Sequence, residues 1–308
     1  MSLAVDLHLQ NYAKSHCLEG LTLPSIQSIM QGADGYTTEQ AKKFLKFQER
    51  INNELLQHRI IRNNAYTTWF KQGQQNKEQI KAFIVQFSVF SNQFLIAQLS
   101  KTLNAESIES MRASKEILAN ELGVVFRPKK INNEIPAAND SVDPELVSTE
   151  GSIEGGLFHF RAAHFEWLLR ISDKLGLTFN DMGKRCNGTP STLFFCDELI
   201  RLYGGENYAI AQTSSYAVEN WAAAGFWGEL VSGFEKYNAV SGTKLPLAFF
   251  TWHDRIESQH ALHTQEELEE IYFTHDIDED NFIKYGNEIL DGVAVFWDGL
   301  EQQRKQLQ

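Results

Sequence analysis

The sequence predicts an all-α protein. Only six prolines occur in 308 residues, and over long stretches apolar residues recur at spacings of three and four, as they do on one face of a helix. Alternating runs bounded by turn residues, which would indicate strands, are scarce. We therefore expect a helical bundle in a single domain over residues 1–308, with an N-terminal extension at 1–36 and a loop insertion at 124–152.

The helical periodicity defines the expected elements. The first begins at a capping threonine, Thr37 or Thr38, and ends at Gly73. The second is rich in phenylalanine on more than one face, which suits either the core or an interface. The loop insertion holds prolines among Asn, Asp, Ser and Gly and has little periodicity. Helices are expected over 37–73, 76–103, 105–123, 157–176, 192–203, 206–238, 247–273 and 279–305.

Charge and cysteine content narrow the classes of partner. The formal net charge is −12, from 28 Lys and Arg against 40 Asp and Glu, so the average surface field repels nucleic acid and anionic membranes. The three cysteines form no CxxC motif, and the N-terminus resembles no signal peptide. Polar residues interrupt the apolar runs before the roughly 18 residues that a membrane span requires. We expect a reduced, cytoplasmic protein with no nucleic-acid or membrane partner.

The segment 252-WHDRIESQHALH-263 carries potential metal ligands. On a helix, Glu257 and His260 lie at about 40° and about −20° from His253, so the three side chains share one narrow face. Imidazole and carboxylate together suit iron, manganese or zinc. The alternative is a solvated, histidine-rich helix face. Asp254 points away from this face, and His263 lies at its margin.

Two further helices carry polar residues on otherwise apolar faces. His164 lies on a face formed by leucine, isoleucine and phenylalanine, and Glu219 lies on a face with Tyr216 and Phe226. A buried carboxylate is costly unless it is paired or binds a metal. Each residue alone could be a hydrogen-bonded core residue, but three helices with ligand-type residues on buried faces favour a metal site. Tyr216, Trp221, Phe226 and Trp252 are candidates for pocket walls, with plain core packing as the alternative.

These motifs resemble a known family. The segments 164-HFEWLLRISDKLGL, 216-YAVEN and 253-HDRIESQH are similar to the ligand motifs of the heme-oxygenase-like diiron oxidases and oxygenases, which are relatives of the thiaminase and pyrroloquinoline-quinone synthase folds. The resemblance covers residues 40–308. It implies a heme-oxygenase-like helical bundle in which Glu219 bridges two metals, with the ligand set Glu154, His164, Glu219, His253, Glu257 and His260.

The sequence departs from the family pattern in the first carboxylate. That glutamate usually lies a turn or two before the first histidine, whereas Glu154 lies ten residues before His164 and Glu150 is the alternative. In the last motif, Glu257 stands where many members have aspartate, and it keeps the same ligand atoms. The acidic run 276-DIDEDN is better explained as a helix-capping turn than as a calcium loop, because Asn281 stands where such a loop requires glycine.

The resemblance implies an enzyme that binds two Fe(II) ions per chain and uses O2 to oxidise a small organic substrate, by N-oxygenation, desaturation or carbon–carbon cleavage. It also implies a homodimer. Two alternatives remain open at this point. One is a metal-independent enzyme of the thiaminase-like or quinone-synthase-like type, and the other is a non-catalytic helical interaction protein.

Overall fold

The structure is a computed structural model that describes residues 3–126, 158–160 and 164–308. Within these ranges, the side chains of 3–6, 109, 125–126, 158–160 and 256–263 are outside the description. The predicted all-α class is confirmed, since the described chain is helical apart from one short pair of strands.

The helices and strands follow one another with short connections. The elements are α1 (Leu3–His16), α2 (Leu23–Gln31), α3 (Thr38–Arg50), the π-helical turn η1 (Ile51–Leu55), α4 (Arg59–Arg62), α5 (Ala65–Phe70), α6 (Lys77–Leu103), α7 (Ile108–Glu121), β1 (Val124–Phe126), β2 (Phe158–Phe160), α8 (His164–Leu175), the 3-10 turns η2 (Phe179–Asp181) and η3 (Arg185–Asn187), α9 (Pro190–Glu198), the π-helical turn η4 (Leu199–Tyr203), α10 (Tyr208–Ala222), α11 (Phe226–Ser241), α12 (Ala248–Thr274) and α13 (Glu279–Gln306).

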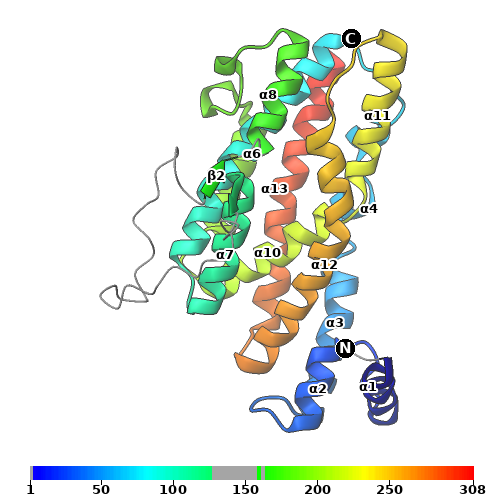
Figure 1. Cartoon of the computed structure of the whole chain (residues 1–308), viewed down its shortest axis with the longest axis vertical. Coiled ribbons are helices and arrows are strands. Elements are labelled where there is room, and N and C mark those ends of the chain that lie inside the picture. Colours follow the sequence, from blue (N-terminus) through cyan, green and yellow to red (C-terminus); the bar gives the residue numbers. More distant parts are fainter. Residues whose placement is uncertain (1–2, 127–157, 161–163) are drawn as a thin grey trace, which may run out of the picture.

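Helix α13 runs through the middle of the bundle (Figure 1). It packs against α9 and α10, while α12 packs against α10 and α11, and α6 packs against α7 and α8. The core between them is largely aromatic. Phe83 and Phe87 of α6 contact Trp297 of α13 and Phe250 of α12. Because all four rings are almost fully buried, they join three helices that are far apart in the sequence.

Helix α6 is a core helix over most of its length. Its phenylalanines at 83 and 87 are buried, whereas Ile96, Leu99 and Leu103 near its C-terminal end are exposed. Within the described ranges, α6 is also the one helix long and apolar enough to cross a membrane, and half of its apolar window is buried inside the bundle. A buried core helix meets the same criteria of length and composition, so this property by itself assigns no membrane.

The prediction of one helix over 37–73 was wrong. The chain leaves α3 through the π-helical turn η1 and then forms the short helices α4 and α5. Asn63 and Asn64 adopt extended backbone angles, and the Asn64 side chain accepts hydrogen bonds from the backbone N–H groups of Tyr66 and Thr67. The asparagine thus starts a new helix instead of continuing the old one.

Three other expected helices differ from the structure. The stretch 206–238 divides into α10 and α11 at Gly225, whose φ of 88° is in the left-handed region. Glu219 and Phe226 are therefore on different helices. The stretch 157–176 begins as strand β2, which pairs antiparallel with β1, so the helix starts only at His164. The stretch 192–203 ends in the π-helical turn η4.

The N-terminal helices lie at the end of the bundle where α12 and α13 are joined (Figure 1). Their contact includes the fully buried Glu269 of α12, whose carboxylate accepts hydrogen bonds from the backbone N–H and the hydroxyl of Thr22. The residues of the predicted N-terminal extension are therefore helical and packed on the bundle. Of the predicted loop insertion, residues 124–126 form β1 and the remainder is outside the described residues.

Candidate metal centre

Two of the predicted ligands meet in the interior. His164 at the start of α8 and His253 in the second turn of α12 have ring centroids 4.7 Å apart. Their side chains are buried, with whole-residue exposures of 5% and 8%. The sequence-based prediction that His164 faces the interior is confirmed. Asp254 and Glu166 on the same two helices are exposed, so the predicted separation of faces also holds for them.

The protonation pattern of His253 follows from its hydrogen bond. Its Nδ1 lies 2.7 Å from the carbonyl oxygen of Phe249. A carbonyl can only accept, so Nδ1 carries the proton, and in the neutral ring Nε2 is the basic nitrogen. The ring is stacked on Trp227 at 4.4 Å between centroids. An imidazole whose Nδ1–H is held by a backbone carbonyl is oriented to offer Nε2 to a metal.

His164 is held in a similar way by a residue that the sequence analysis did not single out. Its Nδ1 lies 2.5 Å from Oε2 of Glu121, in the last turn of α7. Glu121 is mostly buried as well. A carboxylate that accepts from Nδ1 fixes the ring orientation and leaves Nε2 as the basic nitrogen. The one signal in the sequence is electrostatic, because an acidic residue in the last turn of a helix is disfavoured by the helix dipole.

Glu219 lies on α10 among other polar groups. It is partly buried and makes interactions of its own. Nearby, the Nζ of Lys101 donates to Ser215 Oγ at 2.7 Å and lies 4.7 Å from the centre of the Tyr203 ring. Burial lowers the pKa of Lys101, while the negative charges of Glu267 and Glu219 act in the opposite direction. Glu219 therefore belongs to a charged cluster between α6, α10 and α12.

The remaining predicted ligands are only partly described. Glu257 and His260 lie in α12 on the turns that follow His253, but their side chains are outside the description, as is the whole of Glu154. The alternative ligand Glu150 is outside it too. Among the side chains that are described, no group of three or more His, Cys, Asp or Glu residues could hold a metal ion. The structure thus brings His164 and His253 together and adds Glu121 beside them.

The aromatic residues proposed as pocket walls have different roles. Trp221 and Phe226 are buried core residues that stack on each other. Trp252 is partly buried, and its ring lies 4.8 Å from that of His164. Tyr216 lines a cavity of about 660 Å³ between α10, α12 and α13. Only Trp252 and Tyr216 therefore face the candidate site or a cavity.

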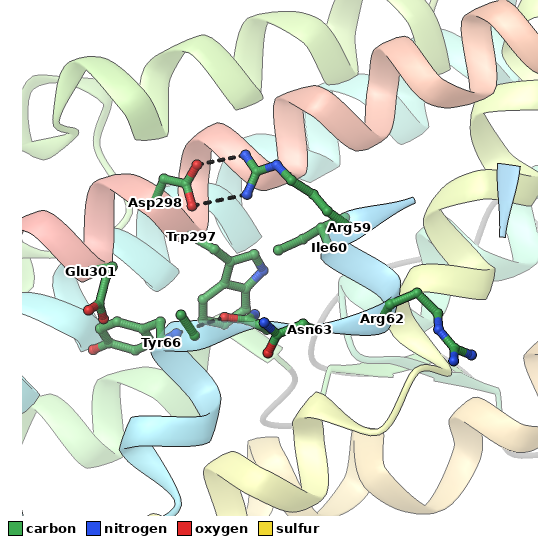
Figure 2. Close-up of a pocket in the computed structure, with 10 residues that line it drawn as sticks. Arg59, Ile60, Arg62, Asn63, Tyr66, Trp297, Asp298 and Glu301 are labelled. Atoms are coloured by element: carbon green, nitrogen blue, oxygen red, sulfur yellow. Dashed lines mark hydrogen bonds and ion pairs between the residues drawn. The ribbon is translucent and has the colours of Figure 1, made fainter. Parts of the chain in front are cut away.

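A second cavity, of about 370 Å³, lies between α4, α5 and α13 (Figure 2). Asp298 and Arg59 line it and form a two-pronged ion pair, and Glu301 lies at the other end of the wall. It is remote from the histidines, because its Trp297 contacts Phe87, Phe87 contacts Phe249, and Phe249 in turn packs on His253. This cavity is not part of the candidate metal centre.

The comparisons with known proteins give no family. No protein-family model matches the chain, and no curated protein matches it.

Proposed function

We propose that this protein is a non-heme diiron enzyme with a heme-oxygenase-like helical bundle, which uses O2 to oxidise a small organic substrate. The observation that carries the proposal is the contact of His164 with His253. The two imidazoles come from helices far apart in the sequence, they are buried side by side, and each has its Nδ1 engaged by an acceptor. Such an arrangement is typical of metal-binding histidines.

The donor set fits a pair of ferrous ions. Besides the two histidines, the proposed ligands are Glu219, Glu257, His260 and the first carboxylate, for which Glu154 was predicted. Glu121 is a further candidate for that carboxylate, because it already contacts His164. Carboxylate and imidazole ligands together suit non-heme iron. When bound, the iron pair would supply the electrons that activate dioxygen.

The residues around the histidines fit this role. Trp227 and Phe249 cover the His253 ring, and Trp252 lies against His164. These aromatic side chains exclude water from the ring nitrogens and keep the rings from rotating. A dry site with fixed ligands is what the protein must contribute to metal-dependent oxidation.

Iron content tests the proposal. Protein loaded with Fe(II) without oxygen, and freed of excess iron, should retain two iron ions per chain and should develop a transient visible absorption band on exposure to O2. His164→Ala and His260→Ala should lose both properties. The exposed His16 provides a matched control, because His16→Ala should retain both.

The opposite result would favour one of the alternatives. If the wild-type protein binds less than one iron ion per chain, and His164→Ala and His260→Ala change nothing, the diiron proposal is wrong. The metal-independent enzyme and the non-catalytic interaction protein would then remain.

A further inference from the structure

We propose that the cavity of about 660 Å³ between α10, α12 and α13 binds an organic cation, an amine or a guanidine, as the substrate of the proposed enzyme. The word substrate rests on the proposed function. The binding itself does not, because the residues that would recognise the cation are not the metal ligands.

The cavity lies beside the ligand-bearing helix faces. Its lining includes Tyr216, one turn before Glu219 on α10, and Thr264, one turn after His260 on α12. Residues three or four positions apart are neighbours on a helix surface. The cavity volume is within the range of small-molecule sites. A ligand in this cavity would therefore lie next to the proposed metal ligands.

The charge of the lining is of one sign. Five carboxylates line the cavity, and neither lysine nor arginine does; the carboxylates belong to Glu106, Glu206, Glu267, Asp276 and Asp278. By contrast, the cavity at α4 and α5 is lined by two arginines and two carboxylates. Several carboxylates around a partly enclosed space attract and concentrate cations.

The carboxylates converge on an aromatic wall. Burial raises the pKa of Tyr208, and the charges of Glu267 and Glu106 raise it further, so both carboxylates lie near its hydroxyl group. Elsewhere in the lining, the rings of Tyr216 and Phe282 are 5.6 Å apart. Aromatic faces bind ammonium and guanidinium groups by cation–π attraction.

One of the lining rings already accepts a cation from the protein. The Nζ of Lys284 lies 4.8 Å from the centre of the Tyr285 ring. Lys101, the nearest described lysine behind Glu267, is instead directed at Ser215 and the Tyr203 ring and does not line the cavity. The acidic lining with aromatic walls therefore matches an amine or guanidine better than an anion.

Matched ligands of opposite charge test the proposal without any metal. Hexylammonium and agmatine, which carries an ammonium and a guanidinium group, are titrated into the full-length protein by isothermal calorimetry, in parallel with hexanoate. We expect both cations to bind, agmatine more tightly, and hexanoate not to bind. Binding of the cations should weaken as salt is raised, because exposed charges are screened.

Neighbouring residues on α12 provide the control. Glu267 lines the cavity, whereas Glu266 is exposed and does not. Glu267→Gln should weaken agmatine binding by roughly fivefold, and Glu266→Gln should not change it. Asp276→Asn is a second test, in the turn before α13, and should act like Glu267→Gln. Circular dichroism melting curves establish that each variant is folded.

The proposal is overturned if hexanoate binds as well as hexylammonium, if neither cation binds, or if Glu266→Gln weakens binding as much as the two lining variants. These failures are separate from failure of the diiron proposal, which is decided by iron content. Retained iron without cation binding would leave the proposed metal centre intact, and cation binding without iron would leave a cation site in a metal-free protein.

Discussion

Glu121 and His164 form a buried carboxylate–histidine pair, with Oε2 and Nδ1 2.5 Å apart, although 43 residues separate them along the chain. Glu121 ends α7, and His164 begins α8. The pair therefore fixes the two helix ends that flank the short β1–β2 ribbon. The contact also offsets the unfavourable position of a carboxylate at the C-terminal end of a helix dipole.

Replacement of Glu121 should weaken metal binding. Removal of a carboxylate that orients a metal-binding histidine typically costs about 10-fold to 100-fold in metal affinity. We expect Glu121→Gln to lower the Fe(II) affinity by this factor, as measured by competition with a chelator under anaerobic conditions. Glu116→Gln, an exposed change on the same helix, should leave the affinity unchanged.

The same assay separates the candidates for the first carboxylate. If Glu154→Gln or Glu150→Gln abolishes iron binding while Glu121→Gln has no effect, the carboxylate predicted from the sequence is the ligand and Glu121 is structural.

Metal binding should be visible in tryptophan fluorescence. Trp227 is stacked on His253, and Trp252 lies against His164, whereas Trp69 packs under Arg304 on the far side of the core. Transition-metal ions quench nearby indoles, so Fe(II) should lower the emission of the wild-type protein. Trp227→Phe should remove most of this quench, while Trp69→Phe should preserve it. A quench that depends equally on both residues would argue against a metal at His253.

The sequence predicts those helices well whose ends are defined by local signals. α6, α12 and α13 begin and end within one or two residues of the predicted bounds. Helix breaks were missed where they depend on side chain–backbone hydrogen bonds or on a single glycine. The Asn64 cap interrupts the expected first helix, and Gly225 interrupts the expected helix 206–238. Periodicity continues through such breaks, because the apolar residues on both sides still face one core.

The candidate site was predictable only in part for a related reason. Helix angle alone placed His164 and His253 on buried faces, and the structure confirms their burial. It could not identify Glu121, because the side chain that accounts for its burial comes from another helix. Nor could it place Glu219 relative to Phe226, because that comparison assumed one continuous helix. Pairwise contacts between helices depend on packing, which the periodicity of a single helix does not contain.

Thiol reactivity should distinguish the three cysteines. Cys17 and Cys186 are exposed, and Cys196 is buried in α9. Burial raises the pKa of Cys196 to about 12, so at pH 8 its reactive thiolate is roughly one part in ten thousand. We expect Cys17 and Cys186 to react with a disulfide reagent at pH 8, and Cys196 to react only after denaturation in urea. Cys196→Ser should therefore leave the native count unchanged and reduce the denatured count by one.

The contact between Thr22 and Glu269 should make the N-terminal helices part of the cooperative fold. Glu269 is fully buried, and Thr22 supplies it with a backbone N–H and a hydroxyl, the latter at 2.6 Å. Thr22→Val keeps the shape but removes the hydroxyl from a charged acceptor, which should lower the free energy of unfolding by about 2 kcal/mol. Urea denaturation followed by circular dichroism measures this change. The control Thr68→Val, an exposed change in α5, should stay within about 0.5 kcal/mol of the wild type. A loss confined to a separate early transition would show instead that α1 and α2 unfold independently of the bundle.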